Sequence, residues 1–264
     1  WHVPQKYFDM YPIEEIIIPP KINNDLDDLP SIGKELAKKR SRDYFTIKNS
    51  GKIKNAIQAY LASISFADDQ VGSILEGLEK SKYSKNTIVI LWSDHGWHLG
   101  SKDHWHKGTL WEESTRIPFI IKAPNSKGNG NKCHRPVDMV NVFPTLISLC
   151  KLNPKSDLDG YDMSSLLTDP DSNWNYPAIT EFGEGNVSVR SENWRYIRYS
   201  DGSEELYNLE NDPYEWKNIE NDKIMEKVKD DHSRWVPKVF KSAVPGKNAF
   251  YFDPYKYTFL NRKS

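Results

Sequence analysis

Fifteen consecutive positions, residues 93–107, hold four histidines and two lysines together with Asp94. No other part of the chain concentrates reactive side chains so tightly. The block follows the apolar run at residues 87–92, which predicts a buried strand. Polar side chains just past the carboxyl end of such a strand lie where open α/β sheets hold their ligands. The sequence therefore predicts a chemical site within this block.

The residue types of the block indicate chemistry on an anionic group. Asp94 supplies a hard oxygen ligand suited to Ca²⁺ or Mg²⁺, whereas the imidazole of His95 matches such cations poorly. Gly96 allows the backbone to turn closely around a bound group, and Lys107 could neutralise an oxyanion or a leaving oxygen. The alternative interpretation of the same pattern is structural: Asp94 caps a turn, and the histidines lie on the surface.

The elements around the block indicate an α/β arrangement. Apolar residues at helical spacing over residues 53–78 predict a long amphipathic helix before the strand at 87–92. A second strand is expected at 117–124 and a short helix at 137–149. The sheet containing both strands is expected to be mostly parallel. Residues 1–50, which include five prolines, are expected to be irregular.

A change of pattern after residue 168 predicts two domains. Residues 1–168 are expected to form part of an α/β catalytic domain, and residues 169–264 a smaller antiparallel subdomain. A helix near 222–235 and an aromatic tail are expected to close that subdomain. Asp201-Gly202 is a hairpin turn signal. Short strands are predicted at 178–182, 187–190, 194–199 and 205–209.

Composition excludes several classes of protein. The 264 residues carry a net charge of −1, which argues against a general nucleic-acid surface. No apolar run reaches the length that a membrane-spanning helix needs. A disulfide between Cys133 and Cys150 is compatible with the sequence, although a low cysteine count fits any compartment.

Three segments of the chain closely resemble the type I, formylglycine-dependent sulfatases, in the branch of iduronate-2-sulfatase and the bacterial polysaccharide sulfatases. They are residues 93–100 (Ser-Asp-His-Gly-Trp-His-Leu-Gly), 104–107 and 110–118, and weaker similarity covers nearly the whole chain. The resemblance implies an alkaline-phosphatase-like α/β fold, with a mostly parallel sheet flanked by helices and a smaller C-terminal antiparallel α+β subdomain. It also implies a sulfuric ester hydrolase that acts on a sulfated carbohydrate, a polysaccharide or its oligosaccharides.

The resemblance implies roles for five residues of the block. Asp94 and His95 match ligands of the active-site divalent cation, usually calcium, with magnesium as the alternative. Lys107 matches the lysine that contacts the sulfate and protonates the leaving alkoxide. His98 and His104 are expected to reach the sulfate or the sugar. Sulfatases of this family are secreted, periplasmic or lysosomal, and the bacterial periplasm or extracellular space is favoured here.

The chain departs from the family pattern at the nucleophile. The family's formylglycine is made from Cys or Ser in a Cys/Ser-x-Pro-Ser-Arg run, and neither Cys133 nor Cys150 lies in one. The first pair of metal-binding aspartates is also missing from the sequence, which starts at Trp1 in what resembles the middle of a family member. We therefore expect an amino-terminal segment, such as another chain of the same precursor, to carry the formylglycine.

Two other functions are open. Phosphonate monoester hydrolases and phosphodiesterases of the same superfamily share the fold and much of the site, and a more cationic pocket would favour them. A non-catalytic glycan-binding protein would explain the missing nucleophile, but it has no need of Asp94 and Lys107. Arg190, Arg195 and Arg198 alternate with apolar residues, so they are expected on a solvated strand face, with a polyanionic sugar as the alternative partner.

Overall fold

The computed structural model describes residues 1–39, 41–241, 250–253, 255–256 and 258–261. Its α-helices are α1 (Gln5–Phe8), α2 (Ser31–Lys38), α3 (Ser41–Asn49), α4 (Ile53–Glu79), α5 (Glu112–Thr115), α6 (Val142–Leu149), α7 (Ser164–Thr168) and α8 (Glu226–Ser233). Short 3₁₀ turns are η1 (Ile13–Glu15), η2 (Ser101–Asp103), η3 (Met139–Asn141) and η4 (Lys223–Met225). The strands are β1 (Val89–Trp92), β2 (His98–Leu99), β3 (Trp105–His106), β4 (Phe119–Lys122), β5 (Ala178–Glu181), β6 (Val187–Arg190), β7 (Trp194–Arg198), β8 (Glu204–Asn208), β9 (Phe250–Asp253) and β10 (Thr258–Asn261).

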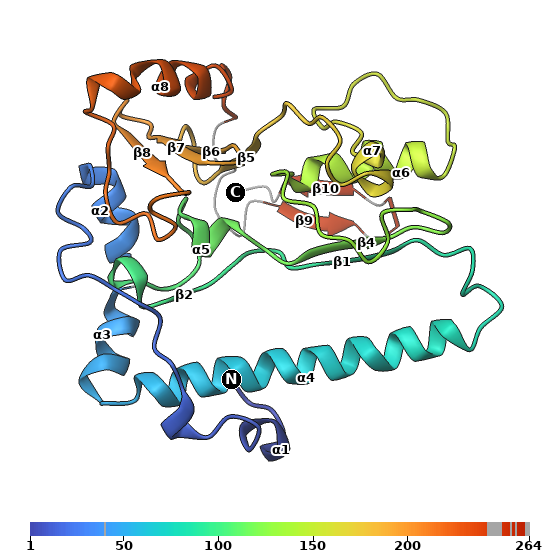
Figure 1. Ribbon diagram of the computed structural model, residues 1–264, viewed down its shortest axis with the longest axis horizontal. Helices are drawn as coiled ribbons and strands as arrows, with labels where there is room; N and C mark the ends of the chain where they lie inside the picture. The colour runs from blue at the N-terminus through green and yellow to red at the C-terminus, as the bar shows by residue number, and fades with distance from the viewer. Residues whose placement is uncertain (40, 242–249, 254, 257, 262–264) are drawn as a thin grey trace.

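The carboxyl-terminal part is built on a four-stranded antiparallel sheet in the order β5-β6-β7-β8, as the sequence predicts. Because side chains alternate along a strand, the sheet has two apolar faces. Val189 and Tyr196 pack with Val228 and Val236 on the side of α8, whereas Tyr207 packs with α2 on the other side. Figure 1 shows α8 and α2 on either side of this sheet.

The strand pair β1–β4 differs from the expectation of a mostly parallel sheet. β1 pairs with β4 in antiparallel register, with Val89 opposite Lys122 and Trp92 opposite Phe119. All strand pairs within the described residues are antiparallel. Each of these two strands therefore has one edge without a strand partner among the described residues. A parallel neighbour for either strand would have to come from residues outside the described ranges.

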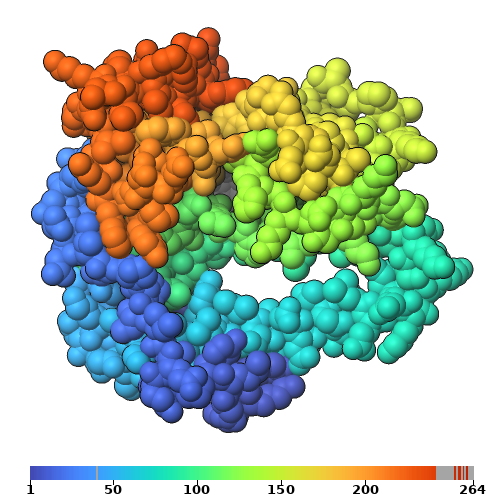
Figure 2. Space-filling view, viewed as in Figure 1, coloured from blue at the N-terminus to red at the C-terminus, as the bar shows by residue number. Residues whose placement is uncertain are grey.

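An open passage separates α4 from the β1–β4 pair (Figure 2). The first part of α4 packs against α1, α3 and η1, but none of its residues after Ala62 is buried. Ile74 in the helix is 72% exposed, and Leu91 in β1 and Ile120 in β4, which lie opposite each other on one face of the pair, are 38% and 57% exposed. The strand predicted at 87–92 is thus present, but its predicted burial is not seen, because no described residue covers this face.

The amino-terminal segment and the aromatic tail differ in part from what the sequence predicts. Residues 31–38 form α2 and residues 41–49 form α3, so the prediction of an irregular amino-terminal segment is wrong there. Pro30 lies at the boundary before α2, where a proline does not interrupt a helix. The aromatic tail includes β9, and Tyr255, which follows this strand, is exposed. The predicted packing of the tail's other rings concerns side chains outside the described residues.

The two cysteines are not bonded to each other, and the helices are not of the membrane-spanning kind within the described residues. Cys133 and Cys150 are both exposed free thiols, so the disulfide that the sequence allowed is not formed. Within the described ranges, no helix combines the length and the apolar character needed to cross a bilayer.

Candidate functional site

Three of the predicted site residues meet in the loop that follows β1. The Nε2 atom of His95 lies 2.6 Å from the Nζ atom of Lys107 and 3.2 Å from Oδ2 of Asp94. Asp94 is open to solvent, with 78% of its side chain exposed, whereas His95 is mostly covered. An acid, an imidazole and an amine therefore form one contiguous row at the surface, over a sequence separation of thirteen residues.

The hydrogen bonds of His95 define which atoms carry protons. Its Nδ1 lies 2.8 Å from the carbonyl oxygen of Gly96, so Nδ1 must donate and the neutral ring keeps its lone pair on Nε2. That lone pair accepts a hydrogen bond from the ammonium of Lys107. Lys107 therefore has two further N–H groups that can donate to an anion in front of the loop.

Ser114 in α5 holds both ends of the site loop. Its carbonyl oxygen accepts a hydrogen bond from Gly96 N at 2.9 Å, and its Oγ accepts one from Gly108 N at 3.1 Å. Gly96 must be glycine, because a Cβ there would lie 2.0 Å from the carbonyl oxygen of Glu113. Gly108 has φ +92°, a conformation that side chains disfavour. These two glycines place His95 and Lys107, their sequence neighbours, within contact distance.

His98 and His104 lie inside the protein and not at the surface of the site. Both are fully buried. His98 bridges the hydroxyl groups of Ser101 (2.8 Å) and Thr109 (2.7 Å), and Nδ1 of His104 donates to the carbonyl oxygen of Ala37 (2.8 Å). Burial and the nearby His104 hold the pKa of His98 well below its usual value, so this ring is neutral. The geometry thus corrects the expected contact with substrate: both histidines support the loop from beneath.

Lys102, the other amine of the block, is also buried. Its ammonium pairs with Asp25 at 2.5 Å and donates to the carbonyl oxygen of Glu215, while its backbone N–H donates to Asp25 at 3.0 Å. A left-handed backbone conformation (φ 54°) turns this side chain inward. The sequence places Lys102 near the site but gives no signal of its burial, because Asp25 is 77 residues away.

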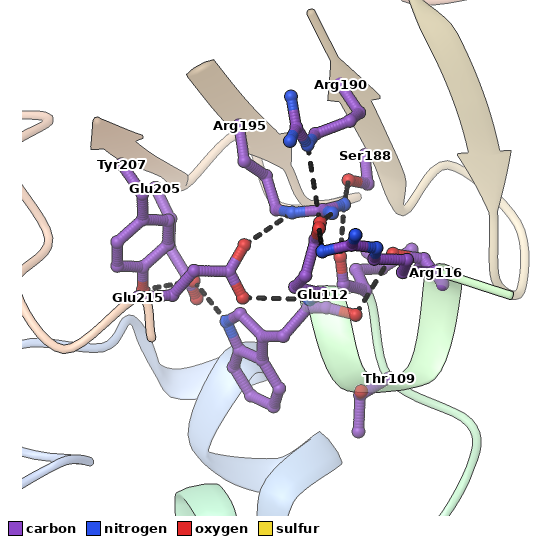
Figure 3. Close-up of polar contacts among 12 residues, drawn as sticks. Thr109, Glu112, Arg116, Ser188, Arg190, Arg195, Glu205, Tyr207 and Glu215 are labelled. Atoms are coloured by element: carbon purple, nitrogen blue, oxygen red, sulfur yellow. Dashed lines mark hydrogen bonds and ion pairs between the residues drawn. The ribbon is translucent and has the colours of Figure 1, made fainter. Parts of the chain in front are cut away.

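A buried network of charges lies behind α5 (Figure 3). Arg195 forms ion pairs with both Glu112 and Glu215, and Arg190 adds a contact of 3.3 Å to Glu112. Burial raises the pKa of Glu112, but the attraction of Arg195 and Arg190 outweighs it, so the pKa lies below its usual value. Arg195 is almost fully buried, which corrects its expected place on a solvated face; of the three arginines only Arg198, on the opposite face of the sheet, is exposed.

A second carboxylate, that of Glu205 in β8, collects three neutral donors. It accepts hydrogen bonds from the indole N–H of Trp111 (2.8 Å) and from the hydroxyl groups of Tyr199 and Tyr207 (2.7 Å each). Burial raises the pKa of Glu205 in spite of these donors. Together the two buried carboxylate clusters bind the carboxyl-terminal sheet to the segment that carries Ser114, and so to the site loop.

The donors at the loop match part of a divalent cation site. The exposed carboxylate of Asp94 is a suitable hard ligand, but Ca²⁺ takes six to eight oxygen ligands. Nε2 of His95 is engaged by Lys107 and reaches a cation only when that lysine turns away. Over the ranges that the structure describes, no group of three or more His, Cys, Asp or Glu side chains is placed to hold a metal ion. A divalent cation held by Asp94 would therefore need further ligands from outside these residues.

Known protein families match both parts of the chain. Residues 2–152 match the family described as Sulfatase, and residues 100–241 match the family described as N-sulphoglucosamine sulphohydrolase, C-terminal. A curated "Sulfatase" of Formosa agariphila is 37% identical over 98% of this chain and 49% of its own length. An "Ulvan-active sulfatase" of the same organism is 27% identical over 82% of this chain and 40% of its length. The chain thus spans about half the length of the curated relatives it matches.

Solved structures show the same fold. A phosphonate monoester hydrolase from Silicibacter pomeroyi aligns with a TM-score of 0.76 at 19% identity, covering 88% of this chain and 51% of that one. A structure described as a 2-O GAG sulfatase aligns with a TM-score of 0.67 at 21% identity, covering 88% and 56%. The predicted alkaline-phosphatase-like α/β fold with a C-terminal antiparallel sheet is therefore confirmed. With a family match over more than half of its residues and a relative that is 37% identical over 98% of this chain, the chain belongs to the sulfatase family.

Proposed function

We propose that the chain forms the carboxyl-terminal part of a sulfatase that removes sulfate from a sulfated carbohydrate, a polysaccharide or its oligosaccharides. The observation that carries this proposal is the contact between His95 and Lys107 at 2.6 Å, beside the exposed Asp94, in a chain of this family. The ulvan-active relative supports a carbohydrate as the substrate.

Each residue of the row has a proposed role. Lys107 is the catalytic residue: its ammonium donates to the sulfate and gives a proton to the leaving alkoxide. His95 accepts a hydrogen bond from Lys107 and fixes the direction of the ammonium. Asp94, with His95 once Lys107 has turned to the sulfate, would hold a divalent cation, calcium or magnesium. When bound, that cation would offset the negative charge of the sulfate oxygens.

The nucleophile, a formylglycine, is proposed to come from an amino-terminal segment outside this sequence. Two observations support this. The relatives are about twice as long as this chain, and the open passage between α4 and β1–β4 is lined by apolar side chains that such a segment would cover. Residues 1–168 would then be the carboxyl-terminal part of the catalytic domain and residues 169–264 its antiparallel subdomain. A secreted, periplasmic or lysosomal location goes with this proposal.

Mass spectrometry of the purified protein, first native and then denaturing, tests the proposed segment. We expect a second polypeptide that stays bound under native conditions and contains a formylglycine-modified peptide. A single species of 30.7 kDa, combined with full activity on an aryl sulfate, would contradict the proposal that the nucleophile lies elsewhere.

A chimera tests the activity itself. This chain replaces the matched region of the Formosa agariphila sulfatase, and sulfate release is measured from an aryl sulfate and from a sulfated polysaccharide. We expect activity that Lys107→Ala abolishes and that Lys85→Ala, a change at an exposed lysine outside the loop, leaves unchanged. A folded chimera that binds the polysaccharide, releases no sulfate and is indifferent to Lys107→Ala would indicate a glycan-binding protein.

A phosphonate monoester hydrolase is the second candidate, favoured by the structural alignment with the Silicibacter pomeroyi enzyme. The two reactions are distinguished by comparing the kcat/KM values of the chimera for an aryl sulfate and for an aryl phosphonate monoester. Because this alignment shares 19% identity, it supports the fold, whereas the sequence relative at 37% supports the sulfatase. We expect the sulfate ester to be the better substrate.

A further inference from the structure

An open groove of about 510 Å³ lies next to the site loop, on the outer side of α5. One wall comes from α5 and the residues after it, and the other comes from the loop that follows β8. The groove is called here the Arg116–Tyr214 groove. It is lined by Glu112, Glu113, Arg116, Ile117, Pro118, Pro213 and Tyr214.

Arg116 makes this groove attractive to anions. Its side chain is 78% exposed and makes a loose ion-pair contact of 3.5 Å to Oε1 of Glu112. The other oxygen of that carboxylate is already taken by Arg195 and Arg190. Three guanidinium groups thus surround Glu112. The other lining acid, Glu113, is half-buried, and burial raises the pKa of its carboxyl and so favours its neutral form.

Tyr214 gives the opposite wall a flat aromatic surface. Its ring stacks on that of Trp216, with centroids 4.8 Å apart and an angle of 19° between the planes, yet Tyr214 stays 43% exposed. An aromatic ring that is backed on one face and open on the other presents its free face to the apolar C–H side of a sugar ring.

Glu215 fixes this aromatic wall. The residue has a left-handed backbone (φ 56°), which is unfavourable for glutamate, and its carboxylate points inward to Arg195 and to the backbone N–H of Glu112 at 2.8 Å. The inward turn of Glu215 leaves its neighbours Tyr214 and Trp216 stacked on the outside. Strained backbone that is maintained by buried contacts is frequent at binding sites.

The groove is also connected to the loop of the proposed active site. Gly96, which follows His95, donates to the carbonyl oxygen of Ser114, and a Cβ at Gly96 would lie 2.8 Å from the carbonyl oxygen of Arg116. The backbone of α5 therefore forms the wall of the groove on one side and the support of the loop on the other. The loop and the groove thus share the backbone of residues 113–116.

We propose that the Arg116–Tyr214 groove binds a second, anionic sugar unit of the substrate, with its sulfate or carboxylate on Arg116 and its ring on Tyr214. This proposal rests on the proposed function. A sulfatase with such a groove would prefer charged oligosaccharides to small sulfate esters. No covalent step takes place in the groove.

Binding to the purified full chain tests the groove without any turnover. The probe is a chondroitin sulfate tetrasaccharide, with its chemically desulfated counterpart for comparison. Fluorescence of the tryptophans, which include Trp216 beneath Tyr214, and isothermal titration calorimetry report the affinity. We expect the sulfated probe to bind at least tenfold more tightly than the desulfated one. Arg116→Ala and Tyr214→Ser should each weaken binding of the sulfated probe by tenfold or more, and Arg116→Lys and Tyr214→Phe by less.

Matched controls separate the groove from general charge effects and from the proposed function. Arg198→Ala removes an exposed arginine of β7 that does not line the groove and should leave the affinity unchanged, and circular dichroism confirms that each variant is folded. Equal binding by wild type, Arg116→Ala and Tyr214→Ser would overturn the proposal, as would an equal loss in Arg198→Ala. If the chimera releases no sulfate but the groove variants still lose binding, the proposed sulfatase activity is wrong and the proposed binding of sugar in the groove is upheld.

Discussion

Glu215 offers the sharpest test of the electrostatics behind the site. Its carboxyl group is fully buried, and burial raises its pKa from the usual 4.5 to about 7, against the attraction of Arg195. The nearby acids Glu113 and Glu112 act in the same direction as burial. The native protein therefore keeps a proton on Glu215 over a pH range in which the unfolded chain has already lost it.

This difference in pKa fixes the sign and the size of the effect on stability. Between pH 4.5 and 7, unfolding releases the proton of Glu215, so rising pH favours unfolding. A pKa difference of about 2.5, at about 1.4 kcal/mol for each pH unit, corresponds to about 3 kcal/mol. The contribution of Glu215 is thus fully present below pH 4.5 and is lost as the pH rises through about 7.

Glu215→Gln isolates this contribution, because the amide has the same shape but no proton to release. Urea unfolding followed by tryptophan fluorescence, repeated between pH 4 and pH 8, gives the free energy of unfolding of both proteins. We expect the difference, wild type minus variant, to fall by about 3 kcal/mol across this range. Glu210→Gln, at an exposed position, should show no such trend. Parallel pH profiles for wild type and Glu215→Gln, or a difference that grows with pH, would refute the reasoning, since they would mean that Arg195 keeps the buried carboxylate charged.

Three further changes give expected outcomes that follow from packing. Gly96→Ala should lower the melting temperature by more than about 2–4 °C, the equivalent of about 1 kcal/mol, because its Cβ meets the carbonyl oxygen of Glu113 at 2.0 Å. Gly77→Ala in α4, where a Cβ meets nothing within 4 Å, should instead stabilise by about 0.5–1 kcal/mol; equal melting temperatures for the two variants would contradict this. Arg195→Met should cost about 3–5 kcal/mol in urea unfolding, because it leaves buried carboxylates unpaired, whereas Arg198→Met should change stability by less than about 0.5 kcal/mol. The chain should bind the dye ANS at the exposed face of β1 and β4, where Leu91 and Ile120 lie opposite each other. Leu91→Ser with Ile120→Ser should reduce the fluorescence by at least half, and an unchanged signal would place the exposed apolar surface elsewhere.

Local patterns in the sequence predict several elements well. The helical spacing of apolar residues gives α4 to within a residue or two, and alternation with turn signals gives β5–β8. The contact between His95 and Lys107 is consistent with the family resemblance, and its short separation of twelve residues keeps it within one loop. These features depend on neighbours in the sequence.

The buried polar clusters depend on distant partners, and the sequence alone does not show them. Arg195 alternates with apolar residues like any solvated strand residue, yet its partner Glu112 is 83 positions away. His98 looks like a site histidine because of its neighbours, but Thr109 and Ser101 satisfy both its ring nitrogens inside the protein. Burial of a polar group is decided by the tertiary partners that can satisfy it, so a composition-based interpretation assigns such residues to the surface.

The packing of α4 has a consequence for the site loop. The helix is about 40 Å long at 1.5 Å per residue, and near its first end Ile57 packs in one cluster with Tyr44 and Trp105. Trp97 and Leu99, from the loop of the candidate site, pack against that same cluster. The end of α4 that carries Ile57 and the loop of the candidate site are therefore packed against the same side chains, so a substitution that loosens this cluster acts on the helix and on the loop together.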